Sequence, residues 1–238
     1  MSSAPHPQAN DTWSKFSAFR VLGDHEPMPG FRLVMQLSPD PTSVARALGL
    51  RSRVSDPVDS ELARGTIRAG IGLLQSRNVS FVYANSEEAV VLVRADAVSR
   101  MGSSMAVYEQ LLSMFSARLA ILLGEEMVVH GRIYELPDLG IARRAFIAAL
   151  EWLEDSASQR ASHRLGMQMQ ALGKPFERAV LASIEGQTNL LRSAGIDLEA
   201  LPSWWWRGIA ARFRGDGGVE LYDDVPSGAE FAALIADV

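Results

Sequence analysis

Two adjacent carboxylates interrupt an otherwise apolar stretch, FVYANSEEAVVLV. The runs 81–83 and 89–93 are rich in β-branched and aromatic residues and indicate the two strands of a hairpin, with Glu87 and Glu88 in the polar segment between them. Carboxylates at a hairpin tip can bind a hard cation such as Mg²⁺, or they can lie in a solvated acidic turn. Because alternate strand residues point to opposite faces, only one of the two is expected to bind a metal ion directly.

A third candidate ligand, Asp40, follows the strand-like run 32–37 in the sequence SPDP. Proline has no amide hydrogen to give to a sheet ladder, so the strand is predicted to end there. Asp40 is either a second metal ligand or a turn residue between prolines. Thr42 is predicted to cap the short helix that follows.

The composition is that of a soluble globular protein. The 238 residues are 47% hydrophobic and 21% charged, and their formal net charge is −5, so the molecule as a whole does not attract nucleic acid. All of the 23 basic residues except Lys15 and Lys174 are arginine, which leaves open a local phosphate-binding groove as well as a simple coding bias. The absence of cysteine excludes disulfides, thiolate zinc sites and cysteine nucleophiles.

The N-terminal sequence MSSAPHPQANDTW lacks the basic and apolar regions of a signal peptide, and no apolar run is long enough to cross a bilayer. We therefore expect a cytoplasmic protein with no membrane association. The Ser, Pro, Gln and Asn content of the first residues predicts a flexible N-terminal segment over residues 1–28.

The elements around the hairpin predict a sheet that positions these carboxylates. In order, the patterns indicate a strand at 32–37, helices within 42–77, the hairpin, a long amphipathic helix at 103–124 and a strand at 127–136. This is the ferredoxin-like order, an antiparallel sheet with two helices on one face, which also forms the palm of many nucleotidyl-transferring enzymes. The fold class is therefore predicted to be α/β (α+β), with a palm-like core over residues 29–138.

Residues 139–238 are predicted to form a helical extension that packs with the core as one compact unit. Helical patterns cover 141–172, as two helices or one bent helix, and 173–197, with a break at Gly186. The sequence GDGG at 215–218 indicates a hairpin turn between two further strands, and the tail predicts a short helix.

Four stretches, taken in order, resemble the tRNA-His guanylyltransferase family and its tRNA-repair relatives, which polymerise in the 3′-to-5′ direction. LLRSAGIDLEALPSWWWRG is similar to a helix that ends in a GI-D/N turn followed by L-P-x-W and R-G, and FVYANSEEAVVLV is similar to the family's S-D-E hairpin. VVHGRIYELPD is similar to its F-D-x-R-V-x-x-x-P strand, and EWLEDSASQR lies where the family carries a W-R-Q-x-D helix. The resemblance spans residues 29–215.

The resemblance implies two-metal nucleotidyl transfer, in which two Mg²⁺ ions held by carboxylates activate an RNA 5′ end and join a nucleotide to it. By position it implies Glu87 and Glu88 as catalytic residues. The family's strand-one aspartate falls on Ser38, and Asp40, two residues downstream, is the candidate catalytic residue that would replace it, so the expected metal ligands are Glu87 and Asp40. The sequence departs from the family at both ligands: Ser38-Pro39 replaces the Asp-Gly of the first strand, and Glu87 replaces an aspartate.

Further residues are implied near the substrates. The nucleotide-binding set comprises Asn85, Ser86, Ser113 and Arg132. The RNA-binding set comprises Arg160, His163, Arg164 and Arg207. The expected partners are GTP or ATP and a tRNA or other RNA 5′ end, and a homo-oligomer is expected through an aromatic surface around Trp205. From the residues alone, Arg132 can equally point to solvent or pair with Glu135, and the basic patch can be a solvated helix face.

Three interpretations of the activity stay open. The first is a divergent nucleotidyltransferase of this family. The second is a catalytically impaired paralogue that binds RNA or a nucleotide, or pairs with an active relative. Loss of the Asp-Gly pair favours the second, and the two hairpin carboxylates oppose it. The third is transfer of a nucleotide to a small molecule instead of RNA.

Overall fold

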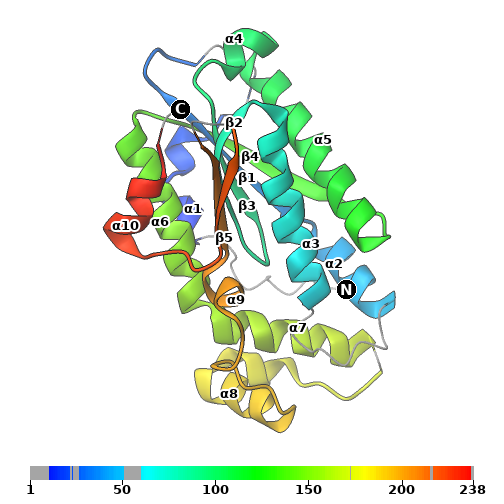
Figure 1. The fold of residues 1–238 in the computed structure, drawn as a ribbon. Coiled ribbons are helices and arrows are strands. Elements are labelled where there is room, and N and C mark those ends of the chain that lie inside the picture. Colours follow the sequence, from blue (N-terminus) through cyan, green and yellow to red (C-terminus); the bar gives the residue numbers. More distant parts are fainter. Residues whose placement is uncertain are drawn as a thin grey trace.

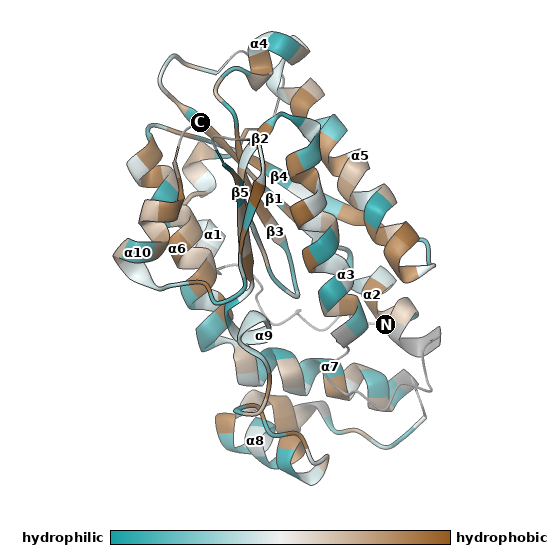
Figure 2. Cartoon of the chain, viewed as in Figure 1, coloured by the Kyte–Doolittle hydropathy of each residue, from teal (hydrophilic) through white to brown (hydrophobic). Residues whose placement is uncertain are grey.

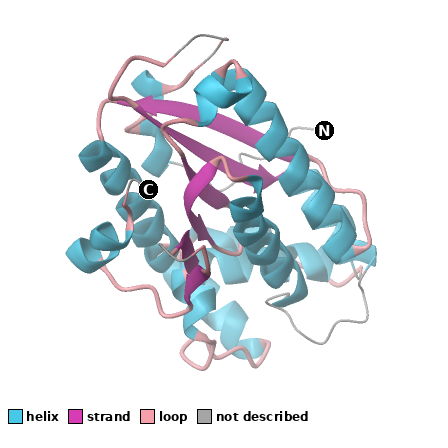
Figure 3. Ribbon diagram, turned by 45° about the horizontal axis from the view of Figure 1, so that its top comes forward, coloured by secondary structure: helices cyan, strands magenta, loops and turns pink. Residues whose placement is uncertain are grey.

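A six-stranded antiparallel sheet forms the centre of the molecule (Figure 1). The computed structural model describes residues 11–21, 23, 27–50, 60–171, 173–214 and 217–236. The strand order across the sheet is β4-β1-β3-β2-β5-β6. The strands are β1 Arg32–Pro39, β2 Val79–Ala84, β3 Ala89–Val93, β4 Val129–Leu136, β5 Ile209–Phe213 and β6 Val219–Tyr222. Helices lie on both sides of these strands (Figure 3).

The first four strands form the predicted ferredoxin-like arrangement, and the predicted fold class is confirmed. β1 lies between β3 and β4, so that Gln36 is opposite Val90 on one side and Arg132 on the other. β1 is two residues longer than predicted, because its pairing with β4 continues to Pro39 opposite Val129. The end of β1 and the turn of the β2–β3 hairpin therefore lie at the same end of the sheet.

The two predicted helices, α3 Ser60–Ile71 and α5 Ser104–Leu123, cover one face of the sheet together with shorter helical elements. The shorter elements on this side are α2 Pro41–Leu50, η2 Gly72–Ser76 and α4 Ala97–Met101. The Ser103 hydroxyl caps the start of α5 by accepting from the amide of Ala106, and Gly124 ends it in the left-handed conformation. Hydrophobic and hydrophilic bands alternate along these helices (Figure 2). Their apolar sides fill the first core with the sheet.

The length of α5 departs from one expectation. By length and composition it is the one helix within the described residues that could cross a membrane, although no apolar run was expected to reach that length. Four of its side chains, Val107, Leu111, Phe115 and Leu119, are nevertheless fully buried in the core between α5 and the sheet.

A second apolar core fills the opposite face. It lies beneath α1 Asp11–Ser14, α6 Leu139–Asp155 and α10 Gly228–Leu234. Trp13 of α1 is only 2% exposed and stacks on Tyr134 of β4, with the ring centroids 4.9 Å apart. Residues 1–10 of the expected flexible segment lie outside the described residues, whereas α1 and the 3-10 turn η1 Ser17–Phe19 are folded against α6 and β4.

Further helices form a layer beyond one end of the sheet (Figure 1). They are α7 Ala157–Ala171, η3 Arg178–Ala182 and α8 Ile184–Ser193. The described part of the stretch predicted as helical, 141–171, thus forms two helices, separated at Ser156. The break predicted at Gly186 was wrong, because the amide of Gly186 donates to the Ser183 hydroxyl and completes the cap of α8.

The C-terminal hairpin is confirmed, and it also extends the palm sheet. β5 pairs with β2, so that Ala211 lies opposite Val82. Gly208, with a φ of 69°, turns the chain from α9 (Ser203–Arg207) into β5, and a Cβ there would lie 2.7 Å from the carbonyl oxygen of Ala84. The sheet therefore crosses the boundary that was drawn at residue 138.

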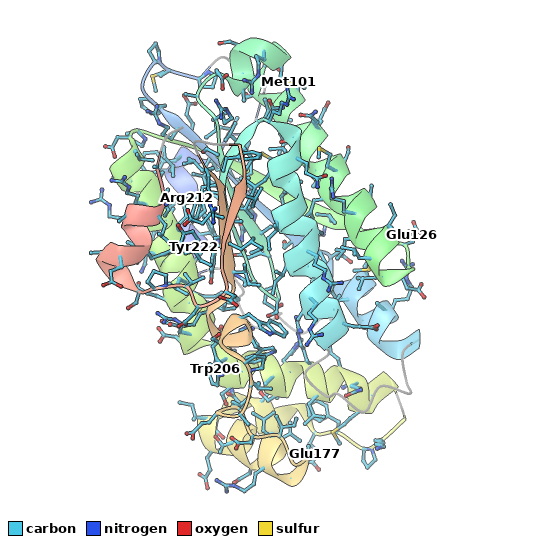
Figure 4. All side chains as sticks on the ribbon, viewed as in Figure 1. Met101, Glu126, Glu177, Trp206, Arg212 and Tyr222 are labelled. Atoms are coloured by element: carbon cyan, nitrogen blue, oxygen red, sulfur yellow. The ribbon has the colours of Figure 1, made fainter. Side chains whose placement is uncertain are left out.

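Trp205 is buried, contrary to the prediction of an exposed aromatic surface around it. Its side chain is 1% exposed and lies in a small core with Leu165 of α7 and Leu191 of α8. Trp206 packs edge-on to it and donates its indole N–H to the carbonyl of Leu198 at 3.0 Å (Figure 4). Trp205 and Trp206 thus pack α9 against the helical layer.

Candidate functional site

Asn85 fixes the turn that carries the two glutamates. Its side-chain Oδ1 accepts from the amides of Glu87 at 2.8 Å and Glu88 at 3.0 Å, and its own amide donates to the carbonyl of Glu88 at 2.9 Å. Asparagine favours such turns because its short side chain can replace a backbone acceptor. The structure therefore gives this predicted nucleotide-binding residue the task of holding the turn.

Glu87 points from the turn to α7, where two arginines meet it. Its Oε1 lies 2.8 Å from Nη2 of Arg164 and 3.8 Å from Nη1 of Arg160. Burial by itself opposes ionisation of Glu87, but the charges of Arg164 and Arg160 outweigh it and hold the pKa of the carboxyl below its usual value. The carboxylate is thus ionised and already neutralised by cations of the protein.

Arg160 and Arg164 point inward rather than to solvent. The guanidinium of Arg160 donates to Ser86 Oγ at 2.7 Å, to the carbonyl of Leu153 at 3.0 Å and to Ser156 Oγ at 3.1 Å. Arg164 donates to the carbonyl of Ser86 at 2.8 Å. Burial lowers the pKa of Arg160 to about 10, which leaves it cationic at neutral pH.

Stacking completes the anchoring of α7. The guanidinium of Arg160 lies 4.6 Å from the ring centroid of Trp205, in a cation–π contact that burial strengthens. Arg160 and Arg164 are four residues apart and so share one face of the helix. That face meets the hairpin turn, so these two predicted RNA-binding residues serve here to join α7 to the sheet.

Glu88 points away from α7, to the face of the sheet beneath α1. It is 4% exposed and accepts from Gln36 Nε2 at 2.5 Å and from Trp13 Nε1 at 3.4 Å. Burial raises the pKa of Glu88 to about 7. The predicted alternation is confirmed, since the two neighbouring carboxylates lie in different surroundings.

Arg132 belongs to the surroundings of Glu88. It lies near enough to Glu88 and Tyr134 for its charge to oppose the effect of burial on the pKa of both groups. This predicted triphosphate ligand therefore lies beside the buried carboxyl, and its predicted alternative partner Glu135 instead accepts from the amide of Met28 at 2.6 Å.

Asp40 lies at the correct end of the sheet but is engaged elsewhere. Its Oδ1 accepts from the amides of Thr42 at 2.9 Å and Ser43 at 3.1 Å, so Asp40, and not Thr42, caps α2. Its Oδ2 lies 2.8 Å from Nε2 of His130. Burial is the largest single effect and opposes ionisation, but the hydrogen bonds from His130 and these amides together outweigh it and hold the pKa of Asp40 below its usual value.

The remaining predicted residues are dispersed. Ser113 is exposed on α5, which packs on the opposite face of the sheet from Glu88. His163 is half-buried on α7, where its charge lowers the pKa of Glu87. Arg207 pairs with Glu154 of α6 at 2.8 Å. Of the predicted set, the structure brings together Ser86, Glu87, Arg160 and Arg164, with His163 beside them.

Solved structures share this architecture, although no family model and no curated protein matches the chain. A bacterial tRNA(His) guanylyltransferase (Thg1)-like protein in complex with ATP aligns at a TM-score of 0.60 and 18% identity, over 90% of each chain. This chain has a Thg1-like palm fold. A bacterial Thg1-like protein in complex with GTP gives 0.54 and 16%, over 90% of this chain and 89% of that one. The tRNA(His) guanylyltransferase of Saccharomyces cerevisiae gives 0.56 and 10%, over 84% and 93%.

The side chains of this Thg1-like palm do not fit the expected pair of Mg²⁺ ions. Such ions need several oxygen ligands that converge without competing cations. Glu87 instead faces two guanidinium groups, Glu88 turns to the other side, and Asp40 is bound to His130. Across the residues that the structure describes, no group of three or more histidine, cysteine, aspartate or glutamate side chains could hold a metal ion.

Sequence reasoning missed the two partners of Glu88 in this Thg1-like palm, Trp13 and Gln36, and the contact of Trp205 with Arg160. Gln36 had a signal, because it is a polar residue in an apolar strand and shares the face of Val34. The signal for Trp13 was weaker: it is an aromatic residue in an otherwise polar segment. Trp205 had none that separates it from its neighbours in sequence.

Proposed function

We propose that the protein binds a nucleoside triphosphate on its Thg1-like palm without two-metal nucleotidyl transfer. The observation that carries this proposal is the pairing of Glu87 with Arg164 and Arg160 at the hairpin turn. A carboxylate so neutralised is a poor ligand for Mg²⁺, whereas arginine pairs are suited to phosphate oxygens. This is the catalytically impaired alternative of the sequence analysis, with a nucleotide as the ligand.

Two further observations support nucleotide binding. Solved proteins with this fold are in complex with ATP and with GTP. The arginines lie at the end of the sheet where the hairpin turns, on a helix that packs directly against it. Their fixed positive charge can take the part that divalent cations take in neutralising phosphate groups.

A second candidate function is addition of a nucleotide to an RNA 5′ end. The similarity of the fold to tRNA(His) guanylyltransferases favours it. It needs metal ligands that are engaged in other contacts here. For that chemistry, Glu87 would have to leave both arginines and Asp40 would have to leave His130 and the cap of α2. Each departure leaves a charge or a helix end without its partner.

Two assays on the wild-type protein decide between these candidates. The first is equilibrium dialysis with labelled GTP and ATP, in EDTA and in Mg²⁺ or Mn²⁺. The second is incorporation of labelled GTP into tRNA shortened at its 5′ end. We expect binding that persists in EDTA and no label on the RNA. Label that requires a metal ion and is lost in Glu87→Ala would establish nucleotidyl transfer instead, and failure to bind either nucleotide would end the proposal.

A further inference from the structure

We propose that Ser86, Arg160 and Arg164 form a phosphate-binding site that the chain's own Glu87 occupies. The Glu87 carboxylate takes the place of a phosphate oxygen, so that a ligand binds only when this side chain turns away. The nature of the ligand, a nucleoside triphosphate, rests on the proposed function. The existence of the anion site does not, because it follows from the contacts of the hairpin turn.

Three donors converge on one carboxylate oxygen. Oε1 of Glu87 lies 2.8 Å from Arg164 Nη2, 3.4 Å from Ser86 Oγ and 3.8 Å from Arg160 Nη1. His163 adds positive potential at the same point, since it lowers the pKa of Glu87 further. Two guanidinium groups and a hydroxyl around one oxygen form the arrangement by which proteins bind phosphate.

The donors hold their positions without help from Glu87. Arg160 is held by Leu153, Ser156 and Trp205, and Arg164 by the carbonyl of Ser86. Both arginine side chains are almost fully buried, at 6% and 5% exposure. A site whose donors are fixed before the ligand arrives loses little conformational entropy on binding.

Glu87 is the movable part of this arrangement. Its side chain is 33% exposed, so it lies between the buried arginines and solvent. Asn85 holds the turn backbone through the amides of Glu87 and Glu88 and the carbonyl of Glu88, and not through the Glu87 carboxylate. Rotation of the Glu87 side chain toward solvent therefore opens the site without unfolding the turn.

The two buried cations favour an anion beside them, because an uncompensated buried charge is unfavourable. Carboxylate and phosphate thus compete for the same site. The apparent affinity of the wild-type protein for phosphate is the affinity of the open site multiplied by the fraction of time that the site is open. Removal of the carboxylate should relieve this competition. A metal-ligand role for Glu87 predicts the opposite sign, namely weaker binding of a metal-bound triphosphate.

The test is calorimetric titration of inorganic tripolyphosphate, in EDTA and at constant ionic strength, into wild type and Glu87→Ala. We expect the variant to bind about tenfold more tightly, the change produced if the wild-type site is open about a tenth of the time. Glu220→Gln is the matched control, because Glu220 is 31% exposed and pairs with Arg212 at 3.0 Å. Arg212 and its neighbour Tyr222 are on β5 and β6, away from the hairpin turn (Figure 4). The control loses the same charge and should bind as wild type does.

Glu87→Gln serves as a second variant if the alanine variant does not fold, since its amide oxygen can stay on Arg164 but carries no charge. Equal or weaker binding by the folded variants would overturn the inference, as would an equal gain in Glu220→Gln. Tripolyphosphate contains no nucleoside, so the two proposals fail separately. If wild type binds GTP but Glu87→Ala binds tripolyphosphate no more tightly than wild type, only the anion site is refuted. If Glu87→Ala binds tripolyphosphate more tightly but wild type does not bind GTP or ATP, only the proposed function is refuted.

Discussion

Glu88→Gln should change how the stability of the protein depends on pH. Burial raises the pKa of Glu88 to about 7 in the folded protein, against an ordinary value of 4.5. Between these values the folded state keeps a proton that the unfolded chain has lost, so stability falls as pH rises through this range. The two pKa values differ by an amount equivalent to about 3 kcal/mol of unfolding free energy. Glutamine stays neutral at every pH and avoids that loss.

The assay is urea unfolding at pH 5, 6, 7 and 8, followed by tryptophan fluorescence. The variant and wild type should have nearly equal free energies of unfolding at pH 5, and the variant should be more stable by up to about 3 kcal/mol at pH 8. Glu151→Gln, on an exposed residue of α6, controls for the loss of one negative charge. A difference that is constant with pH, or that favours wild type as pH rises, would refute the reasoning about burial.

Substitutions at three further positions test other contacts by the same unfolding measurement. Trp13→Phe keeps an aromatic ring over the sheet but removes the indole donor to Glu88; we expect a loss of about 1 to 2 kcal/mol that is larger at pH 8, where the carboxyl is charged. An unchanged variant would mean that the N–H contributes nothing. Asp40→Ala should cost about 1 kcal/mol through loss of the α2 cap, and Asp40→Asn, which retains the capping oxygen, should recover most of it. Gly131→Ala should cost about 1 to 3 kcal/mol, since its Cβ would meet the Tyr108 ring at 2.8 Å; a small change would show that the ring moves aside.

The local elements could be predicted because their signals are local. Alternation and β-branched residues mark β2 and β3, and a serine cap, an apolar stripe and a terminal glycine mark α5. The order of these elements then restricts the sheet to the ferredoxin-like topology. The pairing of β5 with β2 could not be predicted in this way, since no pattern in Ile209–Phe213 specifies which strand it joins.

The site was harder to predict because its partners are distant in sequence. The spacing of Arg160 and Arg164 shows that they share a helix face, but it does not show whether that face meets solvent or protein. The answer depends on Glu87 and Trp205, which come from other parts of the chain; Arg164 and Glu87 are 77 positions apart. Arg160 and Arg164, from the basic patch predicted to contact RNA, are buried beside Glu87 as its counter-charges.

The late position of β5 in the chain has a consequence for protein synthesis. β1 to β4 can form a sheet once residue 136 has left the ribosome, but β2 is then an edge strand until Ile209–Phe213 also emerges. All of Val79–Ala84 is buried in the finished protein, and an open edge of this kind is a template for association with other chains. β5 therefore covers this edge of the nascent palm, and β6, which is only 4 residues long and carries Glu220, leaves a shorter edge at the surface.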